Sequence, residues 1–141
     1  MGGTIVIARY LGEEFCLAGS NAFENAEIAA IADWIGDFFG EWAKTIFEKD
    51  EAKKTDLLDK FGKEVIPKYF DILEKKVSPE GWLYGNKVTW IDLFFYTMIT
   101  KLPTENKNAL DKYPGLDKVK KNVESLPNIA KWIKERPETQ Y

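Results

Sequence analysis

The sequence predicts an all-α fold, a bundle of about five or six helices in one domain. Apolar residues recur with the period of an α-helix along most of the 141 residues. No segment alternates between apolar and polar residues for long enough to predict a strand, and capping residues or prolines occupy the breaks between periodic segments. With 45% apolar residues, a chain of this length buries roughly 70% of its unfolded surface.

The first third of the chain predicts two helices. Residues 5–15 form a short apolar helix in which Ile7, Leu11 and Phe15 recur at spacings of four. After a break, Asn21 and Glu24 have the spacing of a capping box that opens the longest helix. The apolar stripe of that helix comprises Ile28, Ile31, Ile35, Phe38, Phe39 and Trp42.

A second long helix begins at Lys54 or Thr55. Its apolar stripe comprises Leu58, Phe61, Val65, Tyr69 and Leu73. Because proline lacks a backbone N–H and its ring collides with the preceding turn, Pro67 predicts a kink or a local break inside this helix.

Residues 90–100 are apolar on nearly every side, which predicts a buried helix at the centre of the bundle. Thr89 and Asp92 have the spacing of a capping box at its start, and we interpret both as structural residues. Two shorter helices follow, at residues 116–126 and 128–135, and each begins near a proline.

The composition excludes several classes of site. The chain has no histidine, which rules out histidine-activated nucleophiles, histidine general bases and histidine metal sites. Cys16 is the only cysteine, so an internal disulfide or a cysteine zinc site cannot form, and a reducing, cytoplasmic setting is expected. A net charge of −3 argues against a nucleic-acid partner. No apolar run reaches the roughly 20 residues of a membrane span.

Four segments resemble one known family, the cytosolic glutathione S-transferases. Residues 80–92 (EGWLYGNKVTWID) resemble the loop and buried helix of the C-terminal domain, where a glycine-rich approach precedes Val-Thr-x-x-Asp. Residues 7–11 (IARYL) and 17–19 (LAG) resemble the end of the last N-domain helix and the linker after it. Residues 126–137 (LPNIAKWIKERP) resemble the C-terminal helix and tail of the sigma class.

The resemblance implies a domain organisation. Residues 1–15 are expected to be a remnant of the last helix of a thioredoxin-like domain, and residues 16–141 the helical C-terminal domain. The N-terminal domain itself, which binds most of glutathione and in the sigma class carries the thiolate-stabilising tyrosine, is expected to be absent from this chain. The 141-residue chain alone is therefore expected to be inactive.

The resemblance also implies glutathione contacts. Family members have a serine at the position of Thr4 that contacts the γ-glutamyl carboxylate. Sigma-class enzymes use an aspartate at the position of Asp37 to reach the ammonium of glutathione in the other subunit. An aspartate matches at Asp33 too, but Gly36 replaces a third acidic position, so no metal is expected. Three solvated carboxylates on one helix face, including Glu41, are the alternative interpretation.

Phe39 matches the apolar wall of the electrophile pocket by family position, and Trp42 and Phe94 match it more loosely. An aromatic stripe at helical spacing is also typical of a core, and this alternative stays open.

The resemblance therefore predicts the helical portion of a sigma-class-like glutathione transferase. It would supply the electrophile pocket, a homodimer interface along the helix bearing Asp37, and a carboxylate for glutathione, with glutathione as cosubstrate and no cofactor. The reaction would be thiolate attack on an electrophilic carbon or isomerisation of an endoperoxide. The alternative is a free-standing helical module that binds or scaffolds partners without catalysis.

Overall fold

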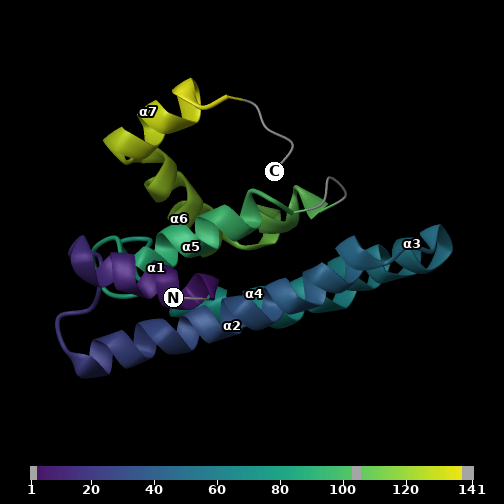
Figure 1. Cartoon of the computed structure of the whole chain (residues 1–141), viewed down its shortest axis with the longest axis horizontal. Coiled ribbons are helices and arrows are strands. Elements are labelled where there is room, and N and C mark those ends of the chain that lie inside the picture. Colours follow the sequence, from purple (N-terminus) through teal and green to yellow (C-terminus); the bar gives the residue numbers. More distant parts are fainter. Residues whose placement is uncertain (1–2, 103–105, 138–141) are drawn as a thin grey trace.

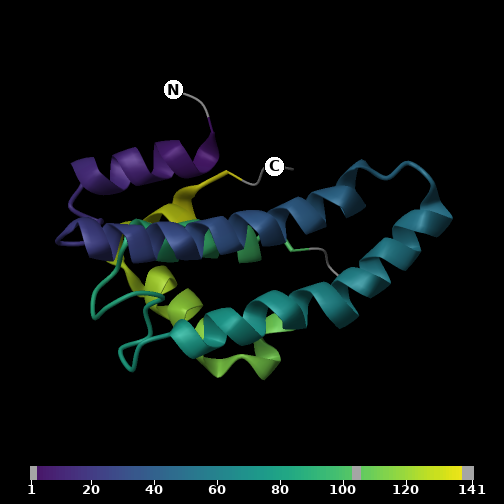
Figure 2. The same cartoon turned by 90° about the horizontal axis from the view of Figure 1, so that it is seen from below.

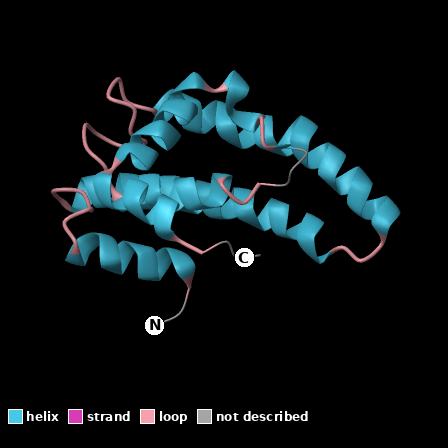
Figure 3. Cartoon of the chain, turned by 90° about the horizontal axis from the view of Figure 1, so that it is seen from above, coloured by secondary structure: helices cyan, strands magenta, loops and turns pink. Residues whose placement is uncertain are grey.

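The computed structural model describes residues 3–102 and 106–137, and every regular element in these ranges is helical (Figure 3). The all-α prediction is confirmed. The elements are α1 (Thr4–Glu14), α2 (Ala22–Phe47), α3 (Glu51–Lys60), η1 (Phe61–Val65), α4 (Ile66–Lys76), α5 (Trp90–Ile99), η3 (Ala109–Lys112), α6 (Pro114–Ser125) and α7 (Pro127–Glu135). Residues 138–141, the end of the predicted domain, lie outside the described residues.

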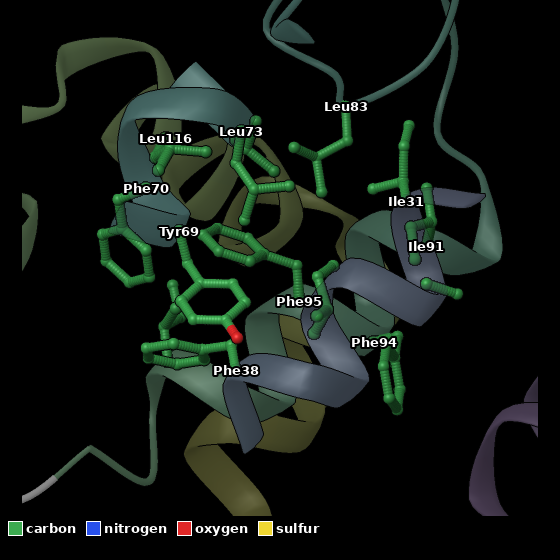
Figure 4. Packing of buried hydrophobic residues seen from close by; sticks show 14 of the residues in the cluster. Ile31, Phe38, Tyr69, Phe70, Leu73, Leu83, Ile91, Phe94, Phe95 and Leu116 are labelled. Carbon is green, nitrogen blue, oxygen red and sulfur yellow. The ribbon is translucent and has the colours of Figure 1, made fainter. Parts of the chain in front are cut away.

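α5 lies at the centre of the core, as its sequence predicts, and packs against α1, α2 and α6. Ile91 is fully buried and Phe95 is 1% exposed. Side chains of α2 and α4 surround them (Figure 4). The Phe70 ring lies 5.3 Å from that of Phe38 and 6.2 Å from that of Phe95, measured between centroids. Burial of each such ring stabilises the fold by roughly 1.5–3 kcal/mol.

α2 is the longest helix and runs along the long axis of the molecule, with α1 on one side and α4 on the other (Figures 1 and 2). Five members of its predicted stripe are buried, namely Ile28, Ile31, Ile35, Phe38 and Trp42. Phe39 differs, because it is 38% exposed and lies beside the core rather than in it. At the N-terminus, the Asn21 side chain accepts a hydrogen bond from the Glu24 N–H at 3.0 Å. Glu24 reaches back to the N–H of Ser20 at 2.7 Å, one residue before the position that the capping box predicts.

The break predicted at Pro67 takes the form of a π-helical turn, η1, between α3 and α4. Ile66 donates its N–H to the carbonyl of Phe61, five residues earlier. Pro67 follows as the second residue of α4, directly after this turn. The helical path from α3 therefore continues into α4 through a π-helical turn that precedes the proline.

α1 packs by a different face from the one that its apolar spacing suggests. Ile7, Leu11 and Phe15 are 41%, 45% and 70% exposed. Gly12 is the buried residue of this helix, and a Cβ on it would collide with the ring of Trp90. The absence of a side chain at Gly12 allows α1 to approach α5 closely, and this approach decides which side of an apolar helix faces the core.

Prolines open α6 and α7, as predicted. The carboxylate of Glu74, on α4, accepts hydrogen bonds from the N–H groups of Gly115 at 2.8 Å and Leu116 at 2.9 Å. These donors belong to the first turn of α6 and have no acceptor within their own helix. Glu74 therefore caps α6 from a neighbouring element.

Candidate ligand-binding pocket

A pocket of about 340 Å³ opens where the start of α1 meets the middle of α2 and the second half of α5. The residues that line it are Gly3, Thr4, Ile5 and Val6 around the start of α1, Gly36 and Phe39 on α2, and Phe94 and Met98 on α5. None of these eight residues is charged. The packing of α1 onto α2 and α5 brings these residues together from distant parts of the sequence.

The N-terminus of α1 forms the polar end of the pocket. The Ile7 N–H donates to the Gly3 carbonyl at 3.1 Å, and the N–H groups before it have no acceptor within the helix. Gly3, the N-cap residue, has no side chain that could accept them. These donors and the positive end of the helix dipole favour an anionic ligand group. The Thr4 hydroxyl adds one more donor at the same place.

Aromatic and thioether side chains form the apolar wall. Phe94 is a buried member of the core cluster that also lines the pocket (Figure 4), and Met98 follows it one turn later on α5. Phe39 lies across from them on α2, and its ring packs edge-on against Trp42 with 5.2 Å between centroids. The arrangement suits a ligand with an anionic end near α1 and an apolar part against the two phenylalanines.

The structure brings together three of the residues singled out from the sequence, namely Thr4, Phe39 and Phe94. Trp42 does not line the pocket: it is 8% exposed and lies behind Phe39. Sequence reasoning assigned none of the other lining residues to the pocket, among them Gly36 and Met98. Helical spacing could have found both, because Gly36 lies three residues before Phe39 and Met98 four residues after Phe94.

Asp37 lies next to Gly36 in sequence but is not among the pocket residues. It is exposed, as is Asp33 one turn earlier. Glu41, one turn later, accepts hydrogen bonds from Lys44 Nζ at 2.7 and 2.8 Å. Within residues 3–102 and 106–137, no group of three or more acidic, cysteine or histidine side chains is placed to hold a metal ion.

Thr89 and Asp92 meet at the start of α5, away from the pocket. The Asp92 carboxylate accepts hydrogen bonds from the N–H groups of Leu83 at 2.7 Å and Thr89 at 2.8 Å, and from the Thr89 hydroxyl at 3.1 Å. Burial raises the pKa of Asp92, and the two backbone hydrogen bonds oppose that shift. The carboxylate thus ties the 78–88 loop to the helix that forms the core.

Residues 36–136 match the family model of the glutathione S-transferase C-terminal domain. The chain belongs to this family. Glutathione S-transferase 1 of Ascaris suum is 33% identical over 140 residues, which cover 96% of this chain and 68% of that protein. The hematopoietic prostaglandin D synthase of Homo sapiens is 32% identical over 143 residues, which cover 97% of this chain and 68% of that protein.

Solved structures agree with this glutathione S-transferase assignment. The prostaglandin synthase D of Nilaparvata lugens superposes with a TM-score of 0.92 at 32% identity, over 99% of this chain and 70% of that one. The likeness therefore includes α1 and the first half of α2, which precede the residues matched by the family model. No helix in the described parts of the chain is both long enough and apolar enough to cross a membrane.

Proposed function

We propose that this chain is the helical part of a sigma-class-like glutathione transferase, and that the pocket between α1, α2 and α5 is where glutathione and an electrophile meet. The observation that carries the proposal is the composition of the pocket. A helix N-terminus and a hydroxyl lie at one end, and two phenylalanines and a methionine lie at the other. In a member of this family, such a pocket suits a tripeptide carboxylate beside an apolar substrate.

The proposal gives a role to three pocket residues and to Trp42 beside them. Thr4 and the first N–H groups of α1 hold the γ-glutamyl carboxylate. Phe39 and Phe94 contact the electrophile, and Trp42 supports Phe39 from behind. The reaction is thiolate attack on an electrophilic carbon or isomerisation of an endoperoxide, since relatives include glutathione transferases and prostaglandin D synthases.

The same proposal covers the organisation of the whole enzyme. Residues 1–15, which include α1, are the end of a thioredoxin-like domain. The rest of that domain contacts the exposed apolar face of α1. The enzyme is a cytoplasmic homodimer that associates along α2. Asp37 lies exposed on that helix, where a carboxylate is free to pair with the ammonium of glutathione held by the second subunit.

A fusion protein tests the proposal. A sigma-class thioredoxin-like domain joined ahead of Thr4 is expected to conjugate glutathione to 1-chloro-2,4-dinitrobenzene well above the solution rate. The 141-residue chain alone is expected to stay at that rate, because the thiolate-stabilising donor, which typically contributes several kcal/mol, lies outside it. A folded but inactive fusion would favour a non-catalytic helical module.

The role of Asp37 has its own prediction, measured as the glutathione Kd of the fusion protein. Asp37→Asn is expected to weaken binding about tenfold or more, because a charge-assisted hydrogen bond contributes roughly 1.5–3 kcal/mol. Asp33→Asn, one turn earlier on the same helix, is the matched control and is expected to be near neutral. Small, equal effects would show that both carboxylates are simply solvated.

A further inference from the structure

Gly36 lines the pocket from α2. It lies in the middle of α2, one turn before Phe39 on the same side of the helix, and it is half-buried. A Cβ built on Gly36 would lie 3.0 Å from Cδ1 of Ile5, which lines the same pocket from α1. That separation is too short for a relaxed contact between two carbon atoms, whose optimum is about 3.5–4.0 Å.

Glycine is an unfavourable residue in the interior of a helix, because it loses more backbone entropy on folding than alanine does. Alanine at position 36 would stabilise the helical conformation of α2, but its methyl group would displace the end of the Ile5 side chain. Ile5 is itself half-buried and lines the pocket, so a displacement of its Cδ1 would change the shape of the space that it lines. The size of the pocket therefore depends on the absence of a side chain at Gly36.

We infer that Gly36 is a specificity-determining residue, which sets the largest apolar ligand that the pocket accepts. This inference rests on the proposed function, because it assigns a substrate class to the same pocket. The surrounding side chains, Ile5, Phe39, Phe94 and Met98, carry no charge. The class that fits is an uncharged aromatic group with more than one ring, which fills the space left by the missing side chain.

The chain offers a matched control. Gly40 lies one turn after Gly36 on the same helix, and a Cβ on Gly40 would meet nothing within 4 Å. Gly36→Ala and Gly40→Ala are therefore the same chemical change with the same benefit to helix propensity. Only the first adds a methyl group against the pocket.

The experiment measures the binding of fluorobenzene and 1-fluoronaphthalene to the full chain by fluorine NMR. Gly36→Ala is expected to weaken 1-fluoronaphthalene binding about tenfold or more and fluorobenzene binding less than about threefold, since overpacking excludes the larger ligand first. Gly40→Ala is expected to leave both affinities unchanged. Adding Ile5→Val to Gly36→Ala removes Cδ1, the atom that the new methyl group meets, and is expected to restore binding of the larger ligand.

The outcomes separate the inference from the proposed function. If the unaltered chain binds neither compound, the pocket is not a ligand site, and both the proposed function and this inference are overturned. If it binds 1-fluoronaphthalene but Gly36→Ala behaves like Gly40→Ala, the inference alone is overturned. The inference alone is also overturned if adding Ile5→Val to Gly36→Ala fails to restore 1-fluoronaphthalene binding, although the helix content of this double variant matches that of the unaltered chain.

Discussion

Cys16, just after α1, has a backbone φ of +58°, in the left-handed region that favours glycine. Its N–H bonds to the Glu13 carbonyl at 3.4 Å and that of Leu17 to the Gly12 carbonyl at 2.8 Å, the pattern of a Schellman motif. A non-glycine residue in this conformation costs roughly 1–2 kcal/mol.

Cys16→Gly is therefore expected to stabilise the fold. The net gain should be about 0.5 kcal/mol, because glycine also increases the entropy of the unfolded chain. Urea denaturation followed by tryptophan fluorescence measures the change. Cys16→Ala is the control, since it removes the thiol but keeps the Cβ. An equal gain from both variants would assign the effect to loss of the thiol.

The Asp92 carboxylate is expected to contribute more to stability than the Thr89 hydroxyl. Asp92→Ala leaves the N–H groups of Leu83 and Thr89 without their acceptor in a buried site, which costs roughly 1–3 kcal/mol for each unpaired group. Thr89→Ala is expected to cost about 1 kcal/mol. Because the two side chains bond each other, the double variant should lose less than the sum in denaturant unfolding. Strict additivity would contradict this coupling.

At the scale of elements, Tyr113 links the start of α6 to α4. Its hydroxyl donates to Asp71 Oδ1 at 3.0 Å, and the side chain is buried. Burial, together with the Asp71 carboxylate, raises the pKa of Tyr113 to about 12. The unfolded chain releases this proton near pH 10, whereas the folded chain retains it, so stability falls as pH rises from about 10 to 12.

Tyr113→Phe is expected to lose about 1 kcal/mol at pH 7, where the hydrogen bond is intact. The unaltered chain should lose about 1.4 kcal/mol between pH 9 and 11 through this tyrosine, and the variant should not. The two curves of unfolding free energy against pH are therefore expected to converge near pH 11. Tyr10→Phe is the control, because Tyr10 is 46% exposed. Parallel curves would show that Tyr113 does not control alkaline stability.

The elements were predictable where periodicity and capping agree. The buried faces of α2 and α5 follow from a strong apolar stripe and from a helix that is apolar all round. The packing face of α1 was not predictable, because the helix has apolar residues on both sides and contact with Trp90 selects the Gly12 side. The pocket was only half predictable for a related reason: Phe39 and Phe94 have recognisable chemistry, whereas Gly36 acts through the absence of a side chain.

At the scale of the whole molecule, the outer face of α1 is the largest run of exposed apolar side chains along one described helix. It comprises Val6, Ile7, Tyr10 and Leu11 together with Phe15, the residue directly after the helix, and each is at least 41% exposed. Contiguous apolar surface of this kind marks an interface. In the proposed enzyme a thioredoxin-like domain covers it, so in the 141-residue polypeptide the face is free to contact a second copy.

In addition to the proposed dimer contact along α2, the 141-residue polypeptide, which has a mass of 16.2 kDa, is therefore expected to self-associate through α1. Replacing Leu11 and Phe15 with serine removes two side chains whose burial stabilises an interface by roughly 1.5–3 kcal/mol each. The association constant, measured by light scattering across micromolar concentrations, should fall at least about tenfold. Phe47→Ser is the control, because Phe47 is 78% exposed but lies at the far end of α2. Association that survives the α1 substitutions and disappears with Phe47→Ser would place the interface at the end of α2 instead.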